Sequence, residues 1–195
     1  NPYDGQMMGI FGDATAKTYG FSRTEQDEFA IESVQRALAT AAAGTFAAEL
    51  APVTVRDRKG ETLITSDEEP GRCDLKRIPT MRPAFAKDGT VTAATSSSIS
   101  DGAASLRLMS EAEAQRRGLK PLARIKSYAI SGCAPEIMGI GPVLATRKAL
   151  ERAGLKLADI DIVELNEAFA AQSLACIDEL GLDPAKVNLD GGAIA

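Results

Sequence analysis

The sequence predicts an α/β protein, because its second half alternates strand-like segments with helix-forming ones. Alternating or β-branched runs occupy residues 123–130, 160–165 and 187–189. Between them, apolar residues recur at helical spacing over 141–154 and 167–180. This order and these lengths are typical of a layered fold in which helices cross over between neighbouring strands.

The first long helix is predicted to begin after Ser22. Ser22 and Glu25 have the spacing of a capping box, in which the hydroxyl accepts a bond from the Glu25 amide and the carboxylate reaches back. The next apolar residues recur at helical spacing and predict an amphipathic helix of about five turns. They are Phe29, Ala30, Val34, Ala37 and Leu38.

A hairpin is predicted next. The β-branched runs 53–55 and 62–65 flank the turn-forming residues 57–60. The following segment, residues 66–79, is charged and rich in turn formers, and we expect it to be an exposed loop.

Helix signals punctuate the second half. A capping box that begins at Ser110 opens a short helix, which Gly118 is expected to end. Pro142 suits the first turn of the next helix and Gly154 its C-terminal cap. The helix over 167–180 is predicted to bury a stripe formed by Phe169, Ala170, Ser173, Leu174 and Ile177.

Composition excludes several classes of protein. The net charge of −5 argues against binding to a nucleic-acid backbone, which requires clustered cations. No apolar run reaches the roughly 18 residues of a membrane helix. The opening residues lack the basic start and apolar core of a signal peptide, so a cytoplasmic location is the expectation.

The cysteine and histidine content limits the kinds of catalytic and metal sites that the chain can form. The three cysteines, Cys73, Cys133 and Cys176, are scattered, which favours a reducing compartment without a disulfide framework. The chain contains no histidine, so it cannot complete a histidine-based triad or a histidine-ligated metal site by itself. We expect no metal site.

Three local patterns are candidates for a site. Residues 95–102 place small hydroxyl side chains before a helix-forming run, and residues 190–192 pair glycines after the last predicted strand. At 165–170, Asn166 follows a strand-like segment, where it could donate a hydrogen bond to a developing oxyanion. Each has a plainer explanation: a capping turn, an ordinary tight turn, or an N-cap asparagine followed by Glu167 complementing the helix dipole.

Taken in order, these patterns resemble the thiolase family over essentially the whole chain. The matching runs are 22–27, 82–85, 89–92, 101–110, 138–142, 166–170 and 188–195. The resemblance implies a thiolase fold, with residues 1–91 forming the later part of the loop domain and residues 92–195 the first portion of the C-terminal βαβα half. It also implies an internal segment that lacks the N-terminal and C-terminal parts of the subunit.

The implied activity is that of an acyl-CoA C-acyltransferase, by Claisen condensation or by thiolysis of 3-ketoacyl-CoA through an acyl-cysteine. In the family the nucleophilic cysteine precedes this segment, and the catalytic histidine and second cysteine follow it, so we expect the segment alone to be inactive. Coenzyme A would be a substrate, with no covalently bound cofactor, in a homo-oligomer (dimer or tetramer) of fatty acid metabolism. The alternatives are an acyl-CoA or lipid binding protein without turnover and a purely structural fragment.

The resemblance also implies site residues. Asn166 matches the asparagine that holds a water facing the thioester oxygen. The matches for residues that bind coenzyme A or line the pantetheine tunnel are Met8, Arg72, Phe85, Ala93, Ser97, Met138, Ala168 and Phe169. Met7 stands where many short-chain thiolases have histidine, which leaves the acyl chain length open.

Overall fold

The computed structural model describes residues 5–58, 60–100 and 102–195. Lys59 of the predicted hairpin turn and Asp101 of the thiolase-like run 101–110 therefore lie outside the described residues, as do residues 1–4 at the start of the chain.

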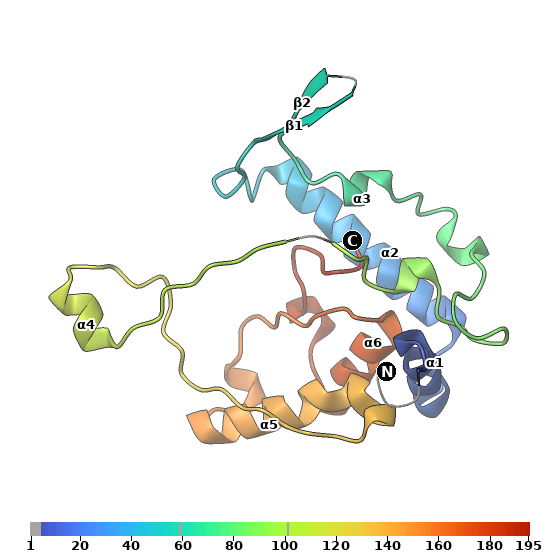
Figure 1. Cartoon of the computed structure of the whole chain (residues 1–195). Helices are drawn as coiled ribbons and strands as arrows, with labels where there is room; N and C mark the ends of the chain where they lie inside the picture. The colour runs from blue at the N-terminus through green and yellow to red at the C-terminus, as the bar shows by residue number, and fades with distance from the viewer. Residues whose placement is uncertain (1–4, 59, 101) are drawn as a thin grey trace.

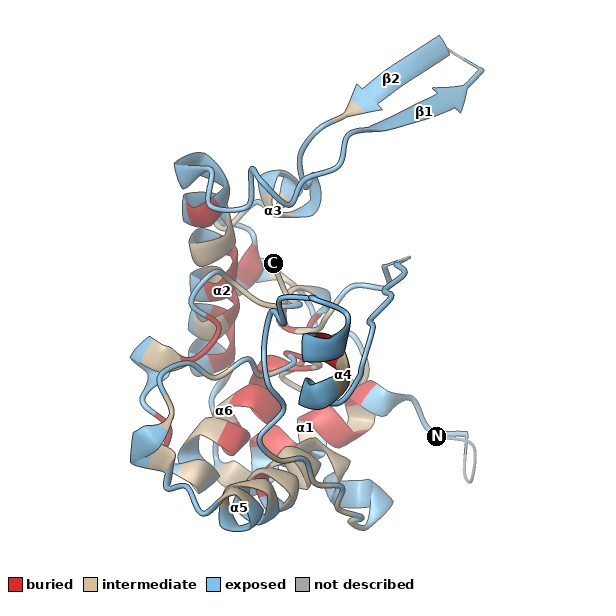
Figure 2. Cartoon of the chain, turned by 90° about the vertical axis from the view of Figure 1, so that its left-hand side faces the viewer, coloured by how far each residue is buried: buried red, intermediate tan, exposed pale blue. Residues whose placement is uncertain are grey.

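In the described part of the chain, the packed body is built from α1 (Met8–Tyr19), α2 (Arg23–Ala43), α5 (Gly141–Ala153) and α6 (Ala170–Leu180). The last of these contacts each of the other three (Figure 1). Buried residues gather where α1, α2 and α6 meet, as Figure 2 shows. No helix in the described ranges has both the length and the apolar character of a bilayer span.

The capping signals predicted these helices well. At the start of α2, Ser22 accepts a bond from the Glu25 amide, and the Glu25 side chain accepts one from Ser22, so the capping box is confirmed. Gly154 adopts a left-handed conformation with φ 66° at the end of α5, also as predicted. At the start of α4 (Glu111–Arg116), Ser110 caps the Glu113 amide.

The predicted hairpin is confirmed as the antiparallel pair β1 (Val53–Asp57) and β2 (Gly60–Ile64). The loop expected at 66–79 is only partly right. It contains the short helix α3 (Glu69–Arg72) and leads into the 3₁₀ turn η1 (Ile78–Thr80). Ile78 is buried, and its carbonyl accepts a bond of 2.9 Å from the Arg23 guanidinium, so this end of the segment packs on α2.

The strand predicted at 123–130 is not a strand in the structure. The segment is extended and exposed, and it pairs with no other strand among the described residues. Instead α5 reaches it with two side chains: Arg152 donates to the Tyr128 carbonyl at 2.9 Å and Lys148 to the Ile130 carbonyl at 3.5 Å. Residues on both sides of α4 project as an extended arm (Figure 1).

The two other predicted strands meet in a single parallel bridge between Val163 and Val187. The parallel direction matches the predicted fold class, but neither segment forms a regular strand. The last long helix also starts later than predicted, at Ala170 instead of Glu167. The reason is that Phe169 is extended, with φ −146° and ψ 146°, and its backbone pairs with Ser96.

Candidate active site

Two segments that are far apart in the sequence meet at the candidate site. The Ser97 amide donates to the Ala168 carbonyl at 3.2 Å, and Ser96 bridges to Phe169. The turn before Ser97 is rigid, because Thr92 and Thr95 form a buried reciprocal cap around η2 (Ala93–Thr95). The structure thus brings together four predicted residues: Ala93, Ser97, Ala168 and Phe169.

An aromatic pair extends this cluster to α1. The rings of Phe85 and Phe169 lie 6.0 Å apart at 90°, an edge-to-face arrangement. The missing side chain of Gly9 leaves room for Phe85, since a Cβ there would lie 2.1 Å from the ring. A Cβ at Gly12 would lie 3.2 Å from the Phe169 ring. Met8 opens α1 immediately before Gly9, and its side chain is exposed.

Met138 lies on η3 (Pro135–Ile140), which packs against both α1 and α6. The next residue, Gly139, sits close to Gln172 of α6, and its carbonyl accepts a bond from the Cys176 thiol at 3.4 Å. Arg72 does not join the cluster. It lies on α3, which packs on α2, and its guanidinium pairs with Glu68 at 2.7 Å.

Asn166 is exposed, and its carboxamide makes no hydrogen bond within the described residues. It lies four residues before α6, whose N-cap is Phe169, so the plainer interpretation of Asn166 as a helix cap is wrong. The Ser97 hydroxyl is likewise without a partner in the described ranges. Both groups are available to a ligand.

The plainer explanation of Glu167, that it complements the helix dipole, is wrong. It precedes α6 and is 1% exposed. Its carboxylate accepts bonds from the Ser33 hydroxyl at 2.8 Å, the Asn188 carboxamide at 2.9 Å and the Ile194 amide at 3.1 Å. Neither Glu167 nor Asn188 was predicted from the sequence as a site residue, and spacing gives no signal for contacts that join α2, the segment before α6 and residues 188–194.

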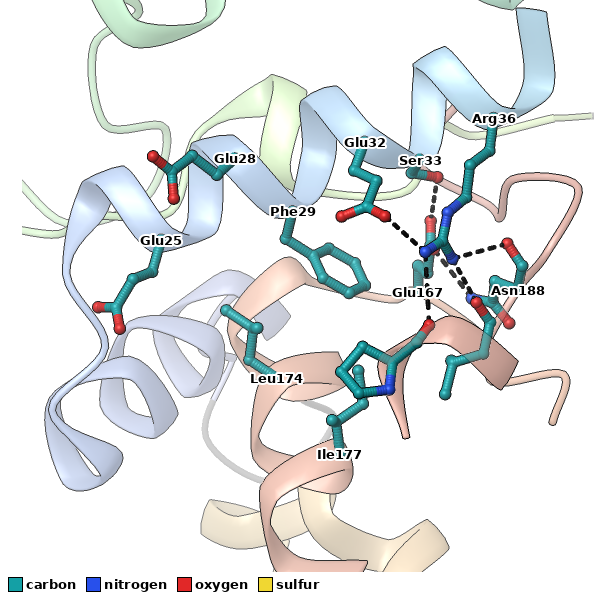
Figure 3. A pocket seen from close by; sticks show the side chains of 12 residues that line it. Glu25, Glu28, Phe29, Glu32, Ser33, Arg36, Glu167, Leu174, Ile177 and Asn188 are labelled. Atoms are coloured by element: carbon teal, nitrogen blue, oxygen red, sulfur yellow. Dashed lines mark hydrogen bonds and ion pairs between the residues drawn. The ribbon is translucent and has the colours of Figure 1, made fainter. Parts of the chain in front are cut away.

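A groove of about 260 Å³ lies between α2 and α6 next to this network (Figure 3). Acidic side chains of α2 line one wall, and Arg36 bridges the groove to the carbonyls of Val187 and Asn188 at 2.5 and 3.2 Å. Glu167 is one of the residues that line the groove, and none of the predicted coenzyme A residues lines it.

Two of the three cysteines lack the character of a catalytic nucleophile. All three are free, and burial raises the pKa of both Cys73 and Cys176. A nucleophilic cysteine requires a lowered pKa, because the thiolate is the reactive form. The described residues contain no group of histidine, cysteine or acidic side chains suited to a metal ion.

Comparison with known proteins defines the class. The profile "Thiolase, N-terminal domain" matches residues 1–112, and "Thiolase, C-terminal domain" matches residues 119–195. The chain therefore belongs to the thiolase family, which confirms the resemblance found in the sequence.

Individual relatives agree. The chain is 53% identical over 195 residues to acetyl-CoA acetyltransferase of Chromobacterium violaceum, covering 99% of this chain and 50% of that protein. It is 52% identical over 192 residues to acetyl-CoA acetyltransferase of Escherichia coli (strain K12), covering 98% and 49% respectively. The crystal structure of the Bacillus anthracis acetyl-CoA acetyltransferase superimposes with a TM-score of 0.93 at 43% identity, over 100% of this chain and 50% of that chain. The thiolase fold is thus confirmed, and the chain spans about half the length of the relatives it matches.

Proposed function

We propose that the native protein that contains these residues is an acyl-CoA C-acyltransferase, with Asn166 as one arm of its oxyanion hole. The observation that carries the proposal is the carboxamide of Asn166, which is exposed and binds no described residue. Asn166 lies two residues before Ala168, whose carbonyl accepts a bond from Ser97. Thiolase membership and the named relatives support it.

In this proposal the pantetheine arm of an acyl-CoA passes the Ser97 hydroxyl and the Phe85–Phe169 pair. Ser97 supplies a hydrogen bond that no described residue uses, and the aromatic rings supply apolar contact. Asn166 donates, directly or through a water, to the thioester oxygen as negative charge develops on it. The thiolate of coenzyme A then attacks the acyl carbon of an acyl-cysteine, so that a new thioester forms as the bond to the cysteine sulfur breaks and the cysteine thiolate is released. In this proposal that cysteine lies outside residues 1–195.

The finer attributes are proposals too. Residues 1–91 would form the later part of the loop domain and residues 92–195 the first portion of the C-terminal half. The native protein would be a cytoplasmic homo-oligomer that takes part in fatty acid metabolism, with acyl-CoA and coenzyme A as its ligands. Arg72, exposed on α3, would approach the adenine end only if its pairing with Glu68 opens.

The test is acetoacetyl-CoA cleavage by the native protein, followed by absorbance. We expect Asn166→Ala to lower kcat by about 10²-fold or more, because loss of one preorganised oxyanion donor typically has this effect. Gln115→Ala on exposed α4 is the matched control, since it deletes a carboxamide far from the site. An unchanged rate for Asn166→Ala would exclude the oxyanion role.

The same preparation separates the alternatives. A native protein that shows no cleavage but is protected from proteolysis by coenzyme A would be an acyl-CoA binding protein without turnover. A protein that shows neither cleavage nor protection would be a structural segment.

A further inference from the structure

At Leu165, immediately before Asn166, the side-chain carboxamide of Asn188 takes the place of a main-chain partner in a parallel strand pair. Val163 donates to the Lys186 carbonyl at 2.9 Å and accepts from the Asn188 amide at 3.0 Å, the pattern of a parallel pair. The next bond of such a ladder would run from the Leu165 amide to the Asn188 carbonyl. Instead, the Leu165 amide donates to Oδ1 of the Asn188 side chain at 2.7 Å.

The backbone conformation of Asn188 explains the substitution. Its φ is +47°, a left-handed conformation, and its carbonyl accepts a bond from the Gly191 amide within the following turn. The main chain therefore leaves the ladder, and the side chain completes it. Nδ2 donates to the Leu165 carbonyl at 2.7 Å, so both polar groups of the Leu165 backbone are bound by one carboxamide. Only asparagine is short enough, carries both a donor and an acceptor, and tolerates left-handed backbone.

Glu167 holds that carboxamide in place. Its Oε1 accepts from Asn188 Nδ2, and its Oε2 accepts from the Ser33 hydroxyl (Figure 3). Oε2 also accepts from the Ile194 amide. Ser33 in turn accepts from the Gly192 amide at 3.0 Å. A Cβ at Gly192 would lie 2.2 Å from the carboxylate carbon, so the backbone is packed against this group. The carboxylate is buried and forms no ion pair with a described residue, so its three hydrogen-bond donors are what satisfy it.

We propose that Glu167 and Asn188 are positioning residues that fix the backbone on both sides of Asn166 and thereby aim its free carboxamide. The residue before Asn166 is Leu165, which Asn188 binds. The residue after it is Glu167, whose carboxylate is fixed to α2 and to the 188–194 segment. The Asn166 side chain makes no hydrogen bond with a described residue, so its orientation depends on these neighbours. The inference deepens the proposed function and rests on it.

The consequence is a specific kinetic coupling. If Glu167 acts through Asn166, a substitution at Glu167 should not lower kcat further once the Asn166 carboxamide has been removed. Glu167→Gln keeps the size of the side chain but turns one acceptor into a donor, which faces either Asn188 Nδ2 or the Ser33 and Ile194 donors. We expect kcat for acetoacetyl-CoA cleavage to fall about 10-fold to 100-fold, because small misplacements of a catalytic group have effects of this size. KM should stay within about twofold, since ground-state binding is untouched.

The experiment compares kcat of the native protein with that of Asn166→Ala, Glu167→Gln and the double variant. We expect the double variant to match Asn166→Ala within about twofold. Losses that multiply in the double variant would mean a merely structural role and would overturn the inference while leaving the proposed function intact. An unchanged Glu167→Gln would overturn it as well. A native protein without turnover, or an Asn166→Ala variant with full activity, would overturn the proposed function and this inference together.

A second variant guards against misfolding. Asn188→Gly keeps the left-handed backbone and removes the side chain that binds Leu165 and Glu167, so it tests the same role without altering the Glu167 carboxylate. It should lower kcat in the same range and show the same lack of further effect in the Asn166→Ala background. Glu113→Gln on α4 is the matched control for Glu167→Gln, because its carboxylate lies on the exposed arm and binds only Arg116 and Arg117 in the described structure.

Discussion

Helix α2 packs directly against the turn at Gly191, and this contact predicts how much a substitution there changes the free energy of unfolding. Gly191 has φ +88°. A Cβ added there would lie 2.8 Å from both the Ser33 carbonyl oxygen and the Ala37 Cβ, and 2.9 Å from the Ala37 amide nitrogen. Two of these atoms belong to the backbone of a helix, which cannot yield as a flexible side chain would. Gly191→Ala must therefore move the turn or accept the overlap.

The size of the effect follows from two contributions. Placing alanine in left-handed backbone costs about 1–2 kcal/mol. Overpacking against a rigid neighbour typically costs about 1–3 kcal/mol more. We therefore expect Gly191→Ala to lower the free energy of unfolding by about 2–5 kcal/mol.

Gly181→Ala is the matched control. Gly181 has φ +64°, but its added Cβ would meet nothing within 4 Å, so only the backbone contribution of about 1–2 kcal/mol applies. Urea unfolding of the native protein measures both free energies of unfolding. Equal losses for the two variants would refute the conclusion that α2 supports the turn by contact.

Two further predictions test other contacts. Gly9→Ala should displace the Phe85 ring, which destabilises the protein by about 1–3 kcal/mol. Up to ~1 kcal/mol of this loss is offset because alanine is a better helix former than glycine. Gly71→Ala, which has open space around it, should show no such loss on urea unfolding. Hydrogen bonds from the Ser22 hydroxyl and then its backbone amide lower the pKa of Glu25 below the ordinary 4.5. The stability they contribute is present above that value and is lost as pH falls through the lower, folded-state pKa. In Glu25→Gln the urea midpoint should therefore depend less on pH in this range, and an identical pH dependence would contradict the assignment.

The helices were predictable because their signals are local. The hydroxyl of Ser22 and the left-handed Gly154 act on backbone groups within a few residues, so the sequence pattern contains the whole interaction. The start of α6 was misplaced because Phe169 pairs with Ser96, a partner 73 residues away by number. Strand prediction failed at 123–130 for a related reason: alternation describes a segment ready to pair, and pairing depends on a distant partner.

The candidate site was predictable only in part. The residues around Ser97 and Phe169 came from the family resemblance, and the structure brings most of them together. The roles of Glu167 and Asn188 could not be read from spacing, because their bonds join α2, the segment before α6 and the 188–194 segment. The left-handed backbone of Asn188 is likewise invisible in a run that reads as a strand.

The two bonds from α5 to the extended segment 123–130 have a consequence for self-association. Residues four apart on a helix are separated by about 6 Å along its axis, and carbonyls two residues apart in extended chain are separated by about 6.6 Å. The spacing of Lys148 and Arg152 along α5 therefore nearly equals the spacing of the Ile130 and Tyr128 carbonyls that they bind. Their bonds occupy two carbonyl acceptors that an added strand would use. We expect a variant that lacks both the Lys148 and the Arg152 cation to leave these carbonyls unbound and to aggregate at lower concentration.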